Sequence, residues 1–254
     1  QPTYHRINDL LLAQKLPYET IERTPQGINL QELEKIFQSG KIKFFYTIPR
    51  FHYPLGHSYS RQEKEEILRL AQLYNVYIIE DDYLSDFDSR RELTFHYLDN
   101  SQRVIYIKSF STSLFPALRI TALLLPPQIQ KTFIAYKSAV DYDSNLIMQK
   151  ALSLYIDSLM FEKNRLALLQ LQEEEARKAQ TLLEQAQLPL SSYLTKDGIL
   201  LDLRSLSSVS ALKHSSLPLD FFEQSYLASC PYQYAKLPYD NLEENVEKLK
   251  DYLK

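Results

Sequence analysis

Apolar and polar positions follow a strand, helix, strand, strand order through the first half of the chain. The aromatic and β-branched run at residues 42–48 predicts a buried strand, because such residues pack well on a pleated surface. Apolar residues spaced i, i+3, i+4 and i+7 predict a helix over residues 60–75, which Ser60 and Glu63 begin as a capping box. Further strands are expected at residues 76–79, 104–107 and 119–125. Apolar runs suited to burial on both faces favour an α/β fold with a mostly parallel sheet.

The pattern changes after the Pro126-Pro127 pair. Helical periodicity continues from about residue 129 to residue 186, and an apolar strand is expected at residues 198–203. A closing amphipathic helix is expected over residues 242–253. The expected domains are a large one at residues 1–127 and, at residues 128–254, a long linking helix with a small α+β domain.

Charge and composition narrow the classes of function. The formal net charge is −3 and the pI is about 6.0, so this chain lacks the basic surface that holds nucleic-acid phosphates. Four glycines against nineteen tyrosines argue against a fully equipped phosphate site, since such sites need close backbone approach. The longest apolar stretches are far too short to cross a bilayer, and the N-terminus has no signal pattern, which favours a cytoplasmic protein.

Cysteine and histidine positions predict no metal site. Cys230 is the single cysteine, which excludes an internal disulfide or a thiolate cluster, and we expect it to be a buried thiol. A metal site is often signalled by two histidines spaced i, i+4 or by a histidine grouped with acidic residues. Neither pattern occurs at His5, His57, His96 or His214. His52, between two aromatic residues, could donate a hydrogen bond beside a ligand or simply pack there, and both interpretations stay open.

Two motifs carry a resemblance to a known family. Residues 78–87 (IIEDDYLSDF) resemble the aspartate motif of fold-type I aminotransferases, in the form used by MocR-type regulators of the GntR superfamily. Residues 103–119 (RVIYIKSFSTSLFPALR) resemble the lysine motif of the same family, and the proline-and-glycine turn at residues 49–56 is also similar. The resemblance implies a pyridoxal-phosphate-dependent transferase fold, with a mostly parallel sheet flanked by helices and a smaller α+β C-terminal domain.

The resemblance also implies roles in binding pyridoxal phosphate. A carboxylate keeps the pyridine nitrogen of this cofactor protonated, and the motif places Asp81 there. Tyr83 would hydrogen-bond the ring hydroxyl, or it serves only in packing. Arg119 would pair with the phosphate, since a planar guanidinium suits an oxyanion. Ser109 and Ser111 would donate their hydroxyl groups to the same phosphate.

Two positions depart from the family pattern. Thr112 stands where the family places its cofactor lysine, and a hydroxyl can neither form an imine with an aldehyde nor act as the amine base. Lys236 stands where the family places the arginine that binds the substrate carboxylate. Lys108 precedes Thr112 by four residues, but the step from strand to turn is expected to aim it elsewhere. We therefore expect a vestigial pocket with no catalytic residue, no covalent cofactor and at most non-covalently bound pyridoxal phosphate.

These expectations favour a regulator over an enzyme. The leading hypothesis is an effector-binding and dimerisation domain of a MocR/GntR-type transcriptional regulator. The resemblance implies a homodimer that binds a small-molecule effector and has no membrane partner. It also implies that the first residue of this chain falls inside the family's large domain. Contact with DNA is therefore expected only through a helix-turn-helix domain outside this chain. The alternative is an active aminotransferase that uses a lysine elsewhere, and a third possibility is that Asp81, Tyr83 and Arg119 hold the free cofactor or a related phosphate ester.

Overall fold

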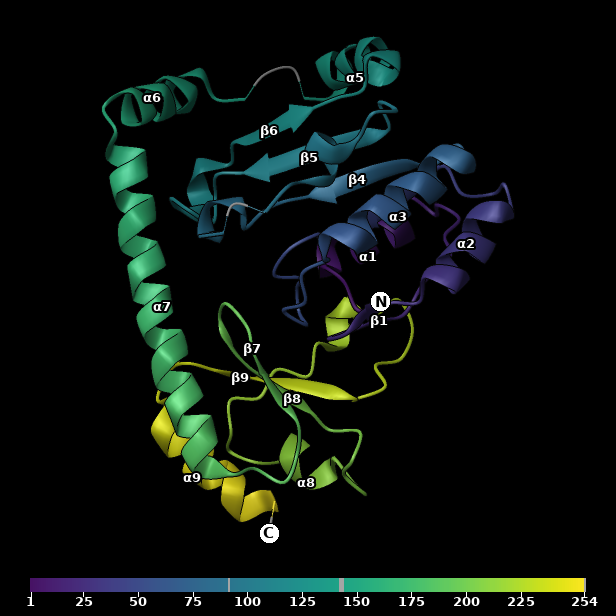
Figure 1. The fold of residues 1–254 in the computed structure, drawn as a ribbon. Helices are drawn as coiled ribbons and strands as arrows, with labels where there is room; N and C mark the ends of the chain where they lie inside the picture. Colours follow the sequence, from purple (N-terminus) through teal and green to yellow (C-terminus); the bar gives the residue numbers. More distant parts are fainter. Residues whose placement is uncertain (91, 142–143, 254) are drawn as a thin grey trace. The chain divides into compact units, whose positions relative to one another are not determined.

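The computed structural model describes residues 1–90, 92–141 and 144–253, which Figure 1 draws as a ribbon. Contacts within the chain group these residues into two compact units. Unit 1 consists of residues 1–29, 51–57 and 171–254, and unit 2 consists of residues 30–50 and 58–170. The domain division expected between residues 127 and 128 stays a prediction.

A four-stranded sheet forms the centre of unit 2, in the order β3-β4-β5-β6 (Figure 1). Its strands are β3 (Phe44–Thr47), β4 (Tyr77–Asp81), β5 (Val104–Ser109) and β6 (Thr121–Leu124). The first three are parallel, and β6 pairs antiparallel with β5. The expected α/β fold with a mostly parallel sheet is confirmed, and each of the four expected strands is present.

Helices cover one face of this sheet. They are α2 (Leu30–Gln38), α3 (Arg61–Leu73) and the short α4 (Phe95–Leu98). The predicted capping box begins α3: Ser60 Oγ accepts the Glu63 N–H at 3.2 Å, and Glu63 Oε2 accepts the Ser60 N–H at 2.8 Å. Ile67 of α3 and Ile78 of β4 are fully buried, so α3 packs its apolar side against this face of the sheet.

The opposite face of the sheet is less covered. Side chains alternate along a strand, so Phe44, Tyr46, Ile79 and Ile107 share this face. Phe44 is 52% exposed and the other three are half-buried. The sequence pattern led us to expect burial on both faces, but burial is complete only for residues such as Ile78 and Val104, on the side where α2, α3 and α4 pack.

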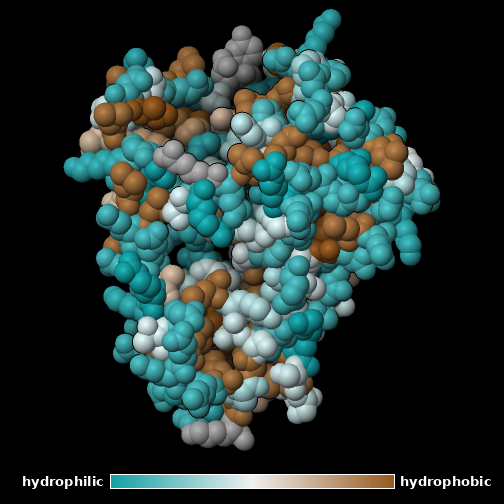
Figure 2. All heavy atoms as spheres, in the orientation of Figure 1, coloured by the Kyte–Doolittle hydropathy of each residue, from teal (hydrophilic) through white to brown (hydrophobic). Residues whose placement is uncertain are grey.

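Three helices follow the sheet, in the region where the sequence predicts one continuous stretch of helical periodicity. They are α5 (Pro127–Val140), α6 (Leu146–Asp157) and α7 (Met160–Ala186), of which α7 continues into unit 1 from Leu171. Residues 142 and 143 of the predicted helical region lie outside the described residues. Asn145 caps α6, since its Oδ1 accepts the N–H groups of Ile147 and Met148. Figure 2 shows apolar side chains at the surface over α6.

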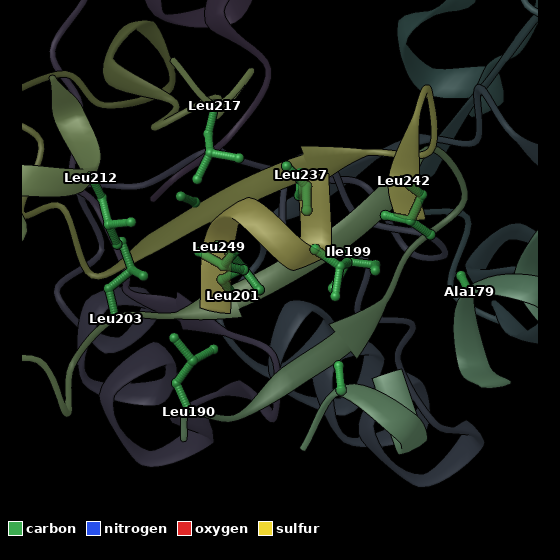
Figure 3. Packing of buried hydrophobic residues seen from close by; sticks show 13 residues of the cluster. Ala179, Leu190, Ile199, Leu201, Leu203, Leu212, Leu217, Leu237, Leu242 and Leu249 are labelled. Carbon is green, nitrogen blue, oxygen red and sulfur yellow. The ribbon is translucent and has the colours of Figure 1, made fainter. Parts of the chain in front are cut away.

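Unit 1 is built on a smaller antiparallel sheet in the order β7-β8-β9. Its elements are α1 (His5–Ala13), the hairpin of β1 (Arg23–Thr24) and β2 (Gly27–Ile28), β7 (Ser192–Leu194), β8 (Gly198–Asp202), α8 (Ser210–Lys213), β9 (Tyr234–Pro238) and α9 (Leu242–Leu253). Figure 3 shows Ile199 and Leu201 of β8 packed with Leu237 of β9 and Leu249 of α9. The strand and the closing helix expected near the C-terminus are confirmed.

Two further observations bear on the sequence predictions. Among the described residues, none of the helices combines the length and the apolar character that crossing a bilayer needs. Cys230 was expected to be buried, and this is wrong: the residue is partly exposed, because it lies in the loop between the 3-10 turn at Glu223–Ser225 and β9. Its Sγ contacts the carbonyl oxygen of Phe221 at 3.3 Å, and partial burial raises the pKa of the thiol.

Candidate functional site

Three consecutive carboxylates lie at the end of β4 and directly after it, and they point to two sides of the sheet. Glu80 and Asp82 point towards the covered face, and Asp81 points to the opposite face, because neighbouring strand residues alternate. Both Glu80 and Asp82 are fully buried, but Asp81 is only half-buried. The alternation therefore gives adjacent acids different surroundings.

Asp81 is paired with a tyrosine from the neighbouring strand. The hydroxyl group of Tyr46 donates a hydrogen bond of 2.6 Å to Asp81 Oδ2. Burial raises the pKa of Asp81, and the Tyr46 hydrogen bond opposes that rise by favouring the charged form. Asp81 thus offers a carboxylate that is already aligned at the C-terminal end of a parallel strand, where ligands of such sheets usually bind.

Asp82 belongs to a buried ion network on the covered face. Arg50, which follows β3, contacts Asp82 Oδ1 through Nε at 2.8 Å and Asp88 Oδ2 through Nη1 at 2.5 Å. The hydroxyl group of Tyr106 on β5 donates to Asp82 Oδ2 at 3.0 Å. Burial raises the pKa of Asp82, and the Arg50 guanidinium opposes the rise. This network fixes the segment after β4 and holds Asp82 in place.

Glu80 accepts backbone hydrogen bonds at the start of α4. Its two carboxyl oxygens accept the N–H groups of Phe95 and His96, each at 2.8 Å. Burial nevertheless raises the pKa of Glu80 to about 7, because desolvation outweighs those two hydrogen bonds. Glu80 therefore fastens α4 to the sheet.

The residues expected to bind phosphate lie around the connection from β5 to β6. Ser109 ends β5 and pairs with Thr121 of β6, and the Phe110 N–H donates to the Ile120 carbonyl at 3.2 Å. Ser109 Oγ accepts the N–H of Ser111 at 3.2 Å. This pairing brings Arg119 back beside the end of β5, two residues before Thr121. The loop thus returns to the strand end from which it leaves.

Thr112 lies in the turn that this connection makes, and its side chain is exposed. Arg119 is also exposed and has a positive φ of 51°. The turn is fastened at its next residue, since Asn164 of α7 donates a hydrogen bond of 2.9 Å to the Ser113 carbonyl oxygen. Tyr83, two residues after Asp81, is half-buried.

Lys108 points away from the face that carries Asp81. Its Nζ contacts Asp86 Oδ1 at 2.5 Å and donates to Ser85 Oγ at 2.9 Å. Lys108 alternates with Ser109 along β5, so it shares the covered face with Asp82 rather than the face of Asp81. This orientation agrees with the sequence argument that Lys108 is aimed elsewhere.

Lys236 lies in unit 1, on the middle of β9. The side chain is 9% exposed, and Nζ contacts Asp197 Oδ2 at 2.5 Å. The ammonium group also lies over two aromatic rings, 5.1 Å from the centre of Tyr53 and 5.7 Å from the centre of Phe222. Its charge is therefore balanced by a carboxylate of this chain.

The residues of unit 2 fit pyridoxal phosphate in part. Asp81 offers a carboxylate for a protonated ring nitrogen, and Ser109, Ser111 and Arg119 offer hydroxyl and guanidinium donors that suit a phosphate. Thr112 offers no amine for a covalent bond to the cofactor aldehyde. When bound, the cofactor supplies an electron-withdrawing ring and an aldehyde, so this donor set is compatible with non-covalent binding.

Several residues of the site were missed in the sequence. Tyr46 could have been found, because strand alternation places it on the face of Asp81. Arg50 was hidden in a turn that the sequence suggested only as a proline-and-glycine motif. Asp88 and Asn164 gave no local signal, since their contacts join segments 38 and 51 residues apart in the chain.

The strand order, the polar strand ends and the small antiparallel sheet define the fold of the fold-type I pyridoxal-phosphate-dependent aminotransferases. Kynurenine aminotransferase from Pyrococcus horikoshii superposes with a TM-score of 0.85 at 22% identity, over 99% of this chain and 67% of that chain. The α-aminoadipate aminotransferase LysN from Thermus thermophilus gives 0.83 at 19% identity, over 99% and 69%. Cystalysin from Treponema denticola gives 0.80 at 14% identity, over 100% and 69%. At these identities the likeness shows the fold alone.

The homologues of this chain are regulators of the MocR/GntR type. The uncharacterised HTH-type transcriptional regulator YcxD of Bacillus subtilis is 43% identical over 166 residues, 65% of this chain and 37% of the relative. The probable rhizopine catabolism regulatory protein MocR of Rhizobium meliloti is 31% identical over 121 residues, 47% and 24%. NorG of Staphylococcus aureus is 29% identical over 167 residues, 64% and 37%. The matches thus span between about a quarter and two fifths of these relatives, and no family model matches the chain.

Proposed function

We propose that this chain is the effector-binding and dimerisation part of a MocR/GntR-type transcriptional regulator, with a pyridoxal-phosphate pocket that has lost its covalent chemistry. Its homologues are HTH-type regulators, and its fold is that of the aminotransferases. The observation that carries the proposal is an exposed threonine, Thr112, at the position where the resemblance places the cofactor lysine. A regulator needs binding and a change of shape, and neither requires that lysine.

Lys108 is a poor substitute for the missing amine. Its ammonium group is engaged by Asp86 and Ser85 on the covered face of the sheet, while Asp81 is on the opposite face. To reach a pyridine ring bound at Asp81, Lys108 would have to break its partly buried ion pair with Asp86. Its side chain would also have to cross from the covered face of the sheet to the opposite face. This geometry supports a pocket without a covalent anchor.

The partners follow from the same proposal. DNA contact would come from the helix-turn-helix part for which the relatives are named, and the net charge of −3 in this chain argues against a second site for nucleic-acid phosphates here. Dimerisation is supported by apolar side chains left exposed on α5 and α6, among them Ile134, Tyr136, Leu146 and Ile147. A small-molecule effector would then act by changing how two copies are held.

Reduction with borohydride tests the covalent chemistry directly. The purified chain is mixed with pyridoxal phosphate, reduced, digested and analysed by mass spectrometry for a pyridoxyl group on lysine. We expect no specific adduct in the wild-type chain and a specific adduct in the Thr112→Lys variant, because that change restores an amine at the predicted position. Phe115→Lys, in the same exposed turn, is the matched control and should gain no specific adduct.

A specific adduct on a wild-type lysine would overturn the proposal. If that adduct disappeared in Lys108→Ala, the alternative of an active aminotransferase with an unrecognised lysine would take its place. The fold likeness to kynurenine aminotransferase and LysN is the observation that favours this alternative. A transamination assay with the same variants would then separate an enzyme from a covalent but inactive binder.

Non-covalent binding of the cofactor has a separate test. Isothermal titration calorimetry with pyridoxal phosphate should show weaker binding in Arg119→Ala than in the wild-type chain, since the guanidinium is the strongest phosphate donor in the set. Arg69→Ala, on the exposed side of α3, is the matched control. Equal affinities in all three chains would exclude Arg119 from the pocket.

A further inference from the structure

A cavity of about 330 Å³ lies within unit 1, between two segments that are far apart in the chain. One wall comes from residues 18–23, which lead into β1, and the other comes from residues 226–234, which lead into β9. The Thr3 N–H donates to the Ser225 carbonyl oxygen at 2.9 Å and so ties the two sides together. Among the described residues, its wall contains none of those that the family resemblance assigns to the cofactor or the substrate. A cavity of this size can take up a small organic molecule.

Tyr234, the first residue of β9, contributes a buried hydroxyl group to this wall. The side chain is 2% exposed, and the hydroxyl group makes no hydrogen bond to any described residue. The ring packs with Leu200 and Phe222 in a buried cluster, and the Arg204 guanidinium lies 5.3 Å from the ring centre. Rotation towards another partner is therefore hindered. Because buried hydroxyl groups are nearly always hydrogen-bonded, an acceptor on a bound molecule would satisfy this one.

Tyr226 and Glu22 add a second hydroxyl group and a carboxylate to the same wall. Burial raises the pKa of Tyr226 and of Tyr234, and the negative charge of Glu22 adds to both rises, so its carboxylate lies near both hydroxyl groups. Both hydroxyl groups therefore keep their protons at neutral pH and can donate. Glu22 is exposed, and its ionised carboxylate can only accept.

The cations in the described part of this wall are engaged within the chain. Arg23 is 4% exposed, and its Nη2 lies 3.1 Å from His57 Nδ1 and donates to the His57 carbonyl oxygen at 3.4 Å. The amino group of Gln1 donates to the Ile21 carbonyl oxygen. A carboxylate ligand would therefore be repelled by Glu22 without gaining a cation of its own. An ammonium ligand would leave the tyrosine hydroxyl groups without an acceptor.

We infer that this cavity of unit 1 binds small primary carboxamides that bear an apolar or aromatic body. The carbonyl oxygen of the ligand accepts from Tyr234 and Tyr226, and its N–H group donates to Glu22. A carboxamide carries both kinds of group and no net charge, so it matches two donors and one acceptor at once. A role for this ligand in regulation rests on the proposed function, whereas its binding does not.

Benzamide, benzoate and benzylamine are suitable probes, because they share a phenyl ring and differ in the charge and the donors of the head group. Isothermal titration calorimetry on the purified chain measures their affinities. We expect benzamide to bind about tenfold more tightly than either charged probe, since each charged head group lacks part of its complement in the wall.

Tyr234→Phe removes only the hydroxyl group and should weaken benzamide binding about three- to tenfold, the effect of one hydrogen bond. The variant should melt no lower than the wild-type chain, because the hydroxyl group has no partner among the described residues. This result would separate a role in binding from a role in stability. Tyr252→Phe, at an exposed position of α9, is the matched control and should bind benzamide as the wild-type chain does.

Glu22→Gln changes the acceptor without changing its shape. Benzamide binding should weaken about threefold, because a charge-assisted hydrogen bond becomes a neutral one. Benzoate binding should strengthen, because the repelling charge is gone. Glu19→Gln, an exposed acid of the same segment, should change neither affinity.

Three outcomes would overturn the inference. They are no binding of benzamide to the wild-type chain, equal benzamide affinity in the wild-type and Tyr234→Phe chains, and benzoate or benzylamine bound as tightly as benzamide. None of these measurements depends on Thr112 or on a lysine adduct. A failure here is therefore distinguishable from a failure of the proposed function, which the borohydride experiment tests.

Discussion

The hydroxyl group of Tyr46 donates a hydrogen bond of 2.6 Å to Asp81, across the parallel pair β3 and β4. This contact joins the residue that the sequence motif singles out to one that it does not mention. It also favours the ionised form of the candidate cofactor carboxylate, and so opposes part of the rise that burial causes in the pKa of Asp81.

Tyr46→Phe should therefore raise the pKa of Asp81 further above its ordinary value. A carboxyl group whose pKa is raised by folding holds its proton to a higher pH than the unfolded chain does, so the free energy of unfolding falls as the pH rises through that pKa. Carbon NMR titration of the aspartate carboxyl groups measures the shift. Tyr97→Phe, at an exposed position, should leave the Asp81 titration unchanged, and an unchanged curve in Tyr46→Phe would contradict the assignment.

Glu80 should make the stability of the fold depend on pH. Its pKa is raised to about 7, so the folded chain binds one more proton than the unfolded chain between about pH 4.5 and pH 7. The Glu80 contribution to stability is present below that range and is lost as the pH rises through it, by about 3 kcal/mol at most. Urea unfolding at pH 5 and pH 7.5 should show a smaller loss in Glu80→Gln than in the wild-type chain. Parallel losses would show that another group is responsible.

Arg50→Met should destabilise the fold strongly. The change leaves Asp82 and Asp88 as buried carboxylates without their cation, and breaking such a pair costs about 3–5 kcal/mol. Denaturant titration measures the loss. Arg61→Met removes the exposed pair with Glu65 and should cost no more than about 0.5 kcal/mol. A similar small loss in both variants would mean that the network adds little.

Gly198→Ala should cost stability through lack of space. A Cβ at this position would collide with the backbone carbonyl oxygen of Leu237 on the paired strand, which cannot move without breaking the ladder. We expect a loss of about 1–3 kcal/mol in thermal or urea unfolding. Gly40→Ala meets no atom within 4 Å and has only a positive φ of 69° to accommodate, so its cost should be about 1 kcal/mol. An equal or smaller cost for Gly198→Ala would contradict the packing argument.

The apolar surface of α6 predicts a change in oligomeric state. Ile147 is 79% exposed and Leu146 is 68% exposed, which is unusual for adjacent large apolar residues unless another surface covers them. If two copies pair through α6, Ile147→Glu should shift the sedimentation profile from dimer towards monomer with little change in stability. Gln149→Glu adds the same charge to the same helix and should remain dimeric. A wild-type chain that sediments as a monomer would exclude this contact.

Local features were the part of the fold that the sequence could predict. The capping box of Ser60 and Glu63 and the apolar runs of β3, β4 and β5 each depend on near neighbours, so their elements were expected correctly. The burial of Cys230 was predicted wrongly, because burial of a lone loop residue depends on what packs around it. The exposure of Phe44 was missed for the same reason.

Pairings between distant segments were the part that could not be predicted. The contacts of Arg50 with Asp88 and of Lys236 with Asp197 join residues 38 and 39 positions apart. Neither pair has a spacing rule, since such contacts depend on loop paths rather than on periodicity. The roles suggested for Ser109, Ser111 and Tyr83 stay predictions, and only a bound ligand would test them.

Because side chains alternate along β4, the number of residues in this strand determines which face of the sheet each of its acids occupies. Deleting one residue of β4 ahead of Glu80 would turn each following side chain to the other face of the sheet. Asp82, which pairs with Arg50, would then point to the less covered face, and Asp81, which pairs with Tyr46, would point into the interior. Substitutions that keep the strand length should therefore be tolerated far more often than single insertions or deletions. Length variation among natural relatives is expected to accumulate in the loops on either side of this strand.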